Sequence, residues 1–154
     1  MQLSTGFPVA IQIIILIAWC PQDVKVTSDI LALSVNTNPV IIRRILSLLK
    51  KAGLITIASG TGGAKLTKTP EEITLLDIYR AVELTEDNIL FGLHDHPNKY
   101  CPIGSRINEV LRPPLEQARI ALEESLGKVT IKELLTTFPP FDYAILKHFN
   151  AETK

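Results

Sequence analysis

The stretch VTSDILALSVNTNPVIIRRILSLLKKAGL, residues 26–54, decides the fold because it contains two helices separated by a short polar turn. Thr27 or Ser28 can cap the first helix with a side-chain oxygen, and Asn38 before a proline is a strong start for the second. The second helix is expected to end at Gly53, which suits a left-handed cap. The pattern predicts a pair of helices joined by a tight turn.

The second of these helices has two different faces when its residues are placed about 100° apart. The apolar face is predicted to hold Ile41, Ile42, Ile45, Leu48, Leu49 and Ala52. The other face is cationic, has no acid, and holds Val40, Arg43, Arg44, Ser47, Lys50 and Lys51. A basic second helix after a short turn is how a helix-turn-helix presents a recognition helix to the major groove. An ordinary solvated surface helix is the alternative.

Charge is unevenly distributed along a chain of 154 residues whose formal net charge is zero. Residues 1–70 hold seven Lys or Arg and two Asp or Glu, a charge of +5, whereas residues 71–154 hold nine and fourteen, a charge of −5. The N-terminal part can therefore approach a polyphosphate. The length and a hydrophobic content of 46% predict one domain with a real core, or one domain with an appendage.

Two cysteines, Cys20 and Cys101, are too few for a secreted disulfide scaffold and indicate a reducing compartment. The apolar run at residues 7–19 is too short to span a bilayer and is interrupted by Gln12. It also lacks the basic start and the cleavage site of a signal peptide. We therefore expect a buried core helix in a cytoplasmic protein.

After Gly53 the pattern changes to β-branched alternation, which predicts a short strand over residues 54–57. The sequence SGTGG at 59–63 permits a sharp reversal, and residues 64–67 can return as a second strand. We expect a β-hairpin wing whose tip amides and Lys65 lie close to a DNA backbone. The likeness to a nucleotide-binding loop fails because the Gly-Lys-Ser/Thr ending is absent.

The rest of the chain predicts a short capped helix and a long amphipathic one. Thr74 and Asp77 have the spacing of a capping box at the start of TLLDIYRAVEL. Residues 103–126 carry an apolar stripe that needs a partner, either a second copy of the chain or the chain's own domain. Pro113 and Pro114 are expected to kink or break this helix.

Four motifs occur in one characteristic order along the chain: the unit NTNPVIIRRILSLLKKAGLI, the wing SGTGGAKL, the helix ITLLDIYRAVE and the junction NKYCPIGSRI. With these motifs the chain resembles the Rrf-type winged-helix transcriptional repressors, the family of IscR, NsrR and CymR, over roughly residues 3–136. It is most similar to the small YwnA-like members. The resemblance implies a mainly α protein with a small β-hairpin wing, in which a winged helix-turn-helix is followed by a long C-terminal dimerisation helix. It also implies a homodimer on palindromic operator DNA.

On this basis we expect a winged helix-turn-helix DNA-binding domain at 1–84, a sensor-type loop at 85–102, a dimerisation helix region at 103–136 and a tail at 137–154. The expected DNA-binding residues are Thr27, Ser28, Asn38, Pro39, Val40, Arg43, Arg44, Ser47, Lys50, Lys51, Ser59, Gly60, Thr61, Gly62, Gly63 and Lys65. The expected residues of the dimer interface are Ile103, Ile107, Leu111, Leu115, Ala118 and Leu122.

The sequence departs from the family pattern at two places. Ser59 stands where members often carry an arginine before the wing glycines. Cluster-binding members have three cysteines between the wing and the long helix, whereas this chain has only Cys101 there, so we expect no [2Fe–2S] cluster. His94, His96 and Cys101 form an H-x-H-x4-C array, which is an alternative zinc site without an evident fourth ligand.

Cys101 precedes Pro102 and is expected at the N-cap of the long helix, where the helix dipole would lower the thiol pKa. A redox response through Cys101 is one hypothesis, and an inert half-buried thiol is the other. For the whole chain the leading hypothesis is a sequence-specific DNA-binding regulator, a repressor. The alternative is a winged-helix module that binds a protein partner. An enzyme is not expected because no Ser-His-Asp order or paired-carboxylate site is evident.

Overall fold

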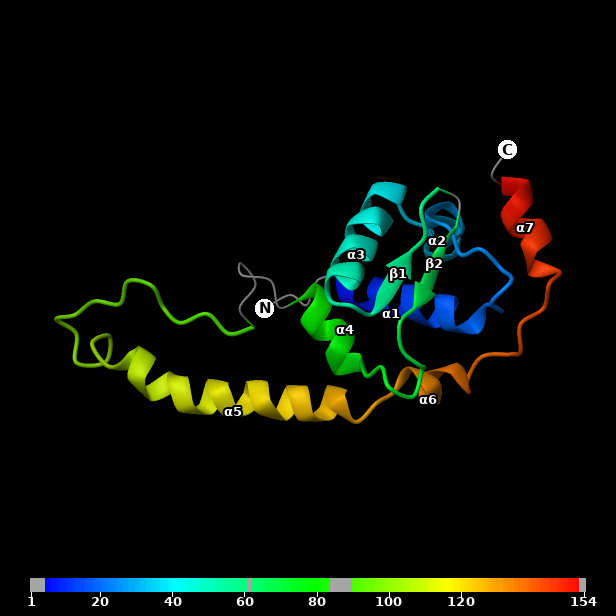
Figure 1. Ribbon diagram of the computed structural model, residues 1–154. Helices are drawn as coiled ribbons and strands as arrows, with labels where there is room; N and C mark the ends of the chain where they lie inside the picture. Colours follow the sequence, from blue (N-terminus) through cyan, green and yellow to red (C-terminus); the bar gives the residue numbers. More distant parts are fainter. Residues whose placement is uncertain (1–4, 61, 84–89, 153–154) are drawn as a thin grey trace.

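The structure is a computed structural model that describes residues 5–60, 62–83 and 90–152 (Figure 1). It has a mainly α fold with one two-stranded antiparallel hairpin and a long helix near the C-terminus. The elements, in chain order, are α1 (Gly6–Trp19), α2 (Ser28–Val35), α3 (Pro39–Lys51), β1 (Ile55–Ile57), β2 (Ala64–Leu66), α4 (Leu75–Val82), α5 (Ile107–Gly127), α6 (Ile131–Leu135) and α7 (Ile145–Glu152).

Helix α1 forms the centre of the core, as its apolar sequence predicted. It packs against α2, α3, α4, α6 and β2, and Ala10, Ile13 and Ile14 along it are completely buried. The facing elements contribute Leu31 from α2 and further residues from α3 and α4. The continuous isoleucine run therefore forms a helix that is covered on several sides, rather than a strand.

The wing follows α3 and has the predicted hairpin form. Ile55 lies opposite Leu66, and Ile57 lies opposite Ala64. The ladder extends one residue beyond the strands because the amide of Thr67 donates to the carbonyl oxygen of Leu54 at 3.1 Å. The expected strands at 54–57 and 64–67 are confirmed, with Leu54 and Thr67 joined by this hydrogen bond just outside β1 and β2. Thr61, at the tip, lies outside the described residues.

Helix α4 begins with the predicted capping box. The Thr74 hydroxyl accepts a hydrogen bond from the amide of Asp77 at 3.2 Å, and the Asp77 carboxylate accepts one from the amide of Thr74 at 2.9 Å. The same end of α4 is tied to the start of α6, since Thr74 and Thr130 form an isolated β-bridge. This bridge holds α6, which comes after α5 in the chain, against the core, where Ile131 is completely buried.

Helix α5 continues through Pro113 and Pro114 as a single helix, so of the kink or break expected there the break is wrong. The two prolines leave the carbonyls of Glu109 and Val110 without intrahelical partners. Both of those residues are exposed, so water can hydrate these carbonyls and the cost of the two prolines is reduced. The helix also begins at Ile107, four residues later than the sequence pattern suggested.

The C-terminal segment, which the sequence left unassigned, folds back onto the N-terminal helices. The indole Nε1 of Trp19 donates to the carbonyl oxygen of Pro139 at 2.7 Å, and the Phe141 ring packs edge-on against Trp19 with centroids 4.8 Å apart. The Tyr143 hydroxyl donates to the Asp23 carboxylate at 3.0 Å. These contacts lead into α7, which lies against α2.

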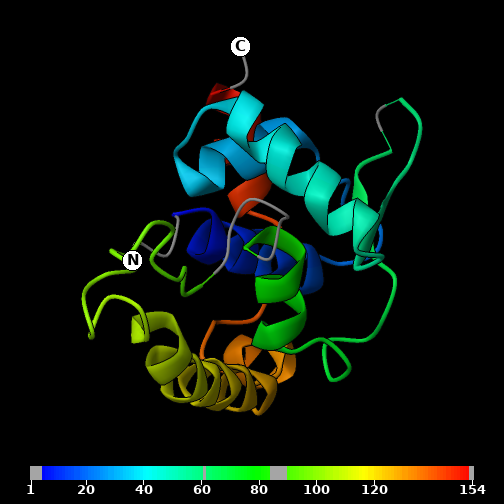
Figure 2. The same cartoon turned by 90° about the vertical axis from the view of Figure 1, so that its left-hand side faces the viewer.

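Figure 1 shows α3 and the wing on one side of the molecule and α5 along the opposite side. The view turned by 90° in Figure 2 shows the same separation, with α1 between them. Within the part of the chain that the structure describes, no helix combines the length and the apolar character needed to cross a bilayer.

Candidate nucleic-acid interface

Helix α3 begins and ends where the sequence predicts. The Asn38 side chain accepts a hydrogen bond from the amide of Val40 at 2.8 Å, and Pro39 occupies the first turn. Asn36, with φ of 55°, ends α2 in the left-handed conformation and so turns the chain toward α3. Gly53, with φ of 75°, turns it away again after Lys51. Two caps and two left-handed residues thus fix the helix pair.

The predicted polar face of α3 is confirmed as exposed, and two expected core positions are corrected. Ile42, Ile45, Leu46 and Leu49 are buried. Ile41 is 47% exposed, and Ala52 is exposed as well. Ile41 lies beside Val40 at the start of the helix, where the core is out of reach. It forms with Val40 an apolar patch that sequence reasoning missed, because a wheel cannot show where a helix extends beyond its partners.

The cations of α3 are not neutralised by the protein. Arg43, Arg44, Lys50 and Lys51 are exposed, and they take part in none of the salt bridges within residues 5–60, 62–83 and 90–152. The last two also complement the negative end of the helix dipole. An exposed helix face with cations, one hydroxyl and no acid favours a polyanionic partner.

The N-terminal end of α2 is the second part of the predicted interface. Thr27 is its N-cap, and its hydroxyl oxygen accepts a hydrogen bond from the amide of Ile30 at 3.4 Å. Ser28 is the first helical residue and is half-buried. The first-turn amides that remain unpaired in any helix are suited to a phosphate oxygen.

The wing is held against the segment that precedes α2. The amide of Ala64 donates to the carbonyl oxygen of Val26 at 2.9 Å. Gly63 has φ of 77°, and a Cβ atom there would lie 2.8 Å from the Val26 nitrogen. Only glycine allows this approach without strain. The predicted wing residues Ser59 and Gly60 are exposed, while Gly62 and Gly63 are half-buried at the root.

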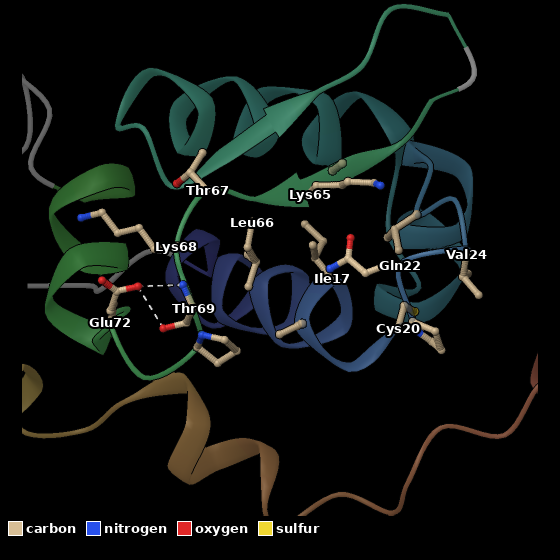
Figure 3. A pocket seen from close by; sticks show the side chains of 15 residues that line it. Ile17, Cys20, Gln22, Val24, Lys65, Leu66, Thr67, Lys68, Thr69 and Glu72 are labelled. Atoms are coloured by element: carbon tan, nitrogen blue, oxygen red, sulfur yellow. Dashed lines mark hydrogen bonds between the residues drawn. The ribbon is translucent and has the colours of Figure 1, made fainter.

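Lys65 leaves the wing on the side of α1. Figure 3 shows its side chain beside Gln22, along a hollow between β2 and the end of α1. The hollow has a volume of about 360 Å³ and ends at Glu72, which accepts two hydrogen bonds from Thr69. Lys65 is exposed and belongs to none of the salt bridges of the described residues. Its charge is thus left without a carboxylate partner among these residues.

Cys101 lies in a turn before α5 and does not cap that helix, so the expected position is wrong. The N-cap of α5 is Arg106. The Cys101 thiol instead accepts hydrogen bonds from the backbone amides of Gly104 and Ile103, which lower its pKa. Cys20 is buried, and desolvation raises its thiol pKa to about 11. The two thiols therefore differ strongly in how readily they ionise.

The geometry gives no support to the zinc alternative. Within the described ranges, no group of three His, Cys, Asp or Glu side chains is arranged to hold a metal ion. The backbone of His94 is instead paired with the Asn108 side chain, which accepts from its amide at 3.0 Å and donates to its carbonyl at 2.8 Å. His96 and Cys101 are not brought together with His94 as ligands.

The predicted interface stripe on α5 is only partly covered. None of the 21 residues of α5 is buried. Leu111 is 37% exposed, and Val110 and Ile120, which the predicted stripe omitted, are also exposed. Ile107, Leu115 and Leu122 are half-buried and Ala118 is exposed. Ile103 is 73% exposed but precedes the helix. A face with this much apolar surface normally meets a partner.

A winged helix-turn-helix with an unneutralised basic second helix defines a class, the DNA-binding proteins that read the duplex with that helix. Residues 3–137 match the Rrf2 family model, which is described as an iron-dependent transcriptional regulator. The chain belongs to the Rrf2 family of DNA-binding transcriptional regulators, and it is not an enzyme.

Two relatives support this assignment. YwnA of Bacillus subtilis (strain 168), provisionally named an HTH-type transcriptional regulator, is 42% identical over 133 residues, which cover 86% of this chain and 96% of YwnA. The HTH-type transcriptional regulator NsrR of Halalkalibacterium halodurans is 32% identical over 142 residues, 88% of this chain and 91% of NsrR. The structure of CymR from B. subtilis has the same fold: it is 23% identical, the match covers 90% of this chain and 99% of CymR, and the TM-score is 0.65.

The family description raises the question of iron, and the donor set of this chain does not fit a cluster. An iron–sulfur cluster is held by four ligands, usually thiolates. Cys101 is the only cysteine after the wing, and Cys20 is buried at the end of α1. The described residues near Cys101 form no metal-binding group.

Proposed function

We propose that the protein is a homodimeric repressor that binds a palindromic operator, with α3 in the major groove, the wing on the adjacent backbone and α5 as the subunit interface. The observation that carries the proposal is the separation in Figures 1 and 2: the unneutralised cations of α3 lie on one side of α1, and the uncovered apolar helix lies on the other. One surface is then free for DNA while the other joins two copies.

Charge supports this arrangement. Residues 1–70 carry +5 and include α3 and the wing, whereas residues 71–154 carry −5 and include α5. A dimer doubles the attraction of the basic side for DNA, and the acidic side is repelled. We assign residues 1–84 to the DNA-binding domain and 103–136 to the dimerisation region, with the loop at 85–102 between them and a tail at 137–154.

The roles of individual residues follow from their places. Arg43 and Arg44 are proposed to contact base edges or phosphates, with Asn38 and Ser47 as polar contacts. Val40 and Ile41, an exposed apolar pair at the start of α3, are suited to thymine methyl groups. The remaining contacts are to the backbone and are assigned to Thr27, Ser28, Pro39, Lys50, Lys51, Ser59, Gly60, Gly62, Gly63 and Lys65.

Fluorescence anisotropy tests the DNA part of the proposal. The purified protein is titrated into labelled duplexes from its own upstream region and into scrambled duplexes, across a salt series. We expect a preference of roughly 10³ or more for the operator and a steep loss of affinity with salt. The double variant R43A/R44A should lose this preference, whereas K128A, which removes one exposed cation beyond the end of α5, should keep it. Equal and weak binding to all duplexes would contradict operator binding.

Sedimentation equilibrium tests the dimer. Leu111→Asp places a charge in the apolar stripe of α5 and should shift the protein toward monomer. Gln117→Asp introduces the same charge at an exposed position of the same helix, about 240° around it from Leu111, and should leave the dimer intact. A wild-type protein that is monomeric at all concentrations would contradict the dimer.

The lowered pKa of the Cys101 thiol favours a further regulatory role, the sensing of peroxide by this residue. The Cys101 thiolate would attack a peroxide oxygen, the O–O bond would break, and hydroxide would leave and be protonated to water. The thiolate is thereby oxidised to a sulfenate while the peroxide is reduced. Cys101→Ser should abolish any effect of hydrogen peroxide on operator affinity, and an unchanged effect in that variant would contradict this role.

A further inference from the structure

The winged domain and α5 are joined by a small network of charged side chains. The carboxylate of Glu123 on α5 accepts a hydrogen bond from Arg80 Nη2 on α4 at 2.9 Å. Its other oxygen pairs with Arg119 Nη1, and Arg119 also pairs with Glu116. The hydrogen bond from Arg80 is the main reason that the pKa of Glu123 lies below its ordinary value. The pair of Arg80 and Glu123 is thus the contact of this network that joins the two helices.

Burial distinguishes Glu123 from an ordinary surface ion pair. Its side chain is 14% exposed, whereas those of Arg80 and Arg119 are 54% and 38% exposed. Exposed ion pairs contribute little because water screens them, but a mostly covered carboxylate with two partners is held in one geometry. The hydrogen bonds are directional, so they favour one orientation of α5 against α4.

The contact between Arg80 and Glu123 lies where a change in the angle between the winged domain and α5 has the largest effect. Helix α5 packs against α4 but against none of the other described elements to a comparable extent, and none of its residues is buried. Figure 1 shows its N-terminal part extending away from the winged domain. Leu126 and Gly127 follow Glu123 closely, and a Cβ atom on Gly127 would lie 3.5 Å from Leu76. The junction is therefore at the C-terminal end of the helix.

A small rotation at this junction becomes a large displacement at the far end. Ile107 is sixteen residues before Glu123, which is about 24 Å along the helix. A rotation of about 10° moves that end by about 4 Å, more than the 3.4 Å rise of one base pair. In a dimer joined through α5, the same rotation moves one α3 relative to the other.

We propose that Glu123 is a positioning residue that sets the centre-to-centre spacing of the two half-sites, by fixing the angle between the winged domain and α5. This inference rests on the proposed dimeric operator binding. It goes beyond that function because it assigns the choice of operator geometry to a residue that touches no DNA. Helix-turn-helix dimers read half-sites about 34–36 Å apart, so the permitted spacing is a property of the protein's own geometry.

The test uses duplexes that the full-length wild-type protein selects from a random library, each then lengthened or shortened at its centre by one or two base pairs. Wild-type affinity should fall about tenfold or more for a change of one base pair. Glu123→Gln keeps the shape of the side chain and removes its charge. This variant should bind the altered spacings within about threefold of the original one.

Glu124→Gln is the matched control, because Glu124 is the next residue on the same helix, is exposed, and belongs to none of the salt bridges of the described residues. It should keep the wild-type spacing profile. Thermal unfolding and binding to an isolated half-site should be unchanged in both variants, which separates positioning from loss of fold.

An E123Q profile as sharp as that of the wild type would overturn the inference while leaving operator binding established. The same holds if E124Q broadens the profile equally. A wild-type protein that is monomeric, or that shows no spacing preference, would overturn the proposed function and this inference with it.

Discussion

The amide of Ala64 in β2 donates to the carbonyl oxygen of Val26 at 2.9 Å, one residue before the cap of α2. This hydrogen bond joins the root of the wing to the start of the helix pair, although 38 positions separate the two residues in sequence. The wing therefore cannot swing independently of the helix-turn-helix.

Gly63→Ala should displace the wing. The new Cβ would lie 2.8 Å from the Val26 nitrogen in a residue with φ of 77°, so both contact and backbone are strained. We expect a loss of about 1–3 kcal/mol in the free energy of unfolding, together with weaker DNA binding. Urea unfolding and fluorescence anisotropy measure the two effects.

Gly60→Ala is the control for backbone strain alone. Gly60 has φ of 71°, but a Cβ atom there would meet nothing within 4 Å. It should therefore cost less stability than G63A and leave the root of the wing in place. Equal losses in both variants would show that the approach to Val26 is unimportant.

Two cations of α3 should behave differently when they are removed. Arg43→Ala should relax the preference at one operator position by about 1–3 kcal/mol if Arg43 reads a base. Lys50→Ala should weaken binding to all sequences alike and reduce the slope of the salt dependence by about one, as for a phosphate contact. Anisotropy titrations against single-base operator variants at several salt concentrations measure both. Unchanged binding in both variants would place the DNA on another face.

Alkylation should distinguish the two thiols. The amides of Gly104 and Ile103 lower the pKa of Cys101, so its thiolate forms at lower pH than that of an ordinary cysteine. Cys20 is buried with a pKa of about 11 and stays protonated up to about pH 9. Iodoacetamide labelling followed by mass spectrometry should show one fast site, whose rate rises with pH through a midpoint below the usual thiol value. Fast labelling of folded C101S would contradict this.

Removal of residues 138–154 should uncover Trp19, the only tryptophan of the chain. The truncated protein would lose the Phe141 ring and the carbonyl of Pro139, both in contact with that indole. We expect a red-shifted fluorescence maximum and a loss of about 1–3 kcal/mol in stability.

Tyr143→Phe is the matched control for the tail. It removes the hydrogen bond to Asp23 and keeps the ring that packs against Phe141. Trp19 should then stay covered and its emission unchanged. An unshifted spectrum in the truncated protein would mean that the tail does not cover Trp19 in solution.

The elements that local chemistry specifies were predictable from the sequence. Asn38 and Thr74 predict the starts of their helices because a capping side chain acts within three residues. The wing glycines predict a turn because their conformational freedom is also a local property. The exposed cations of α3 followed from helical periodicity. These signals need no knowledge of distant segments.

Features that depend on distant partners were not predictable. Ile41 was placed in the core because periodicity does not reveal where the neighbouring helices stop. Cys101 was expected to cap the long helix, but a turn intervenes before α5, whose N-cap is Arg106. Pro113 and Pro114 were expected to kink or break a helix that in fact continues through both. The bridge from Arg80 to Glu123 joins residues 43 positions apart and leaves no local pattern.

No residue of α5 is buried, so the stability of the fold can depend on the concentration of the protein. If α5 is covered by a second copy, as proposed, the fold is stabilised by mass action, and the unfolding temperature should rise with protein concentration. The rate at which the regulator is synthesised would then affect the stability of each molecule as well as the number of molecules available for the operator. At low abundance the proposed dimer would dissociate, so fewer chains would be paired for the operator than the total amount of protein suggests.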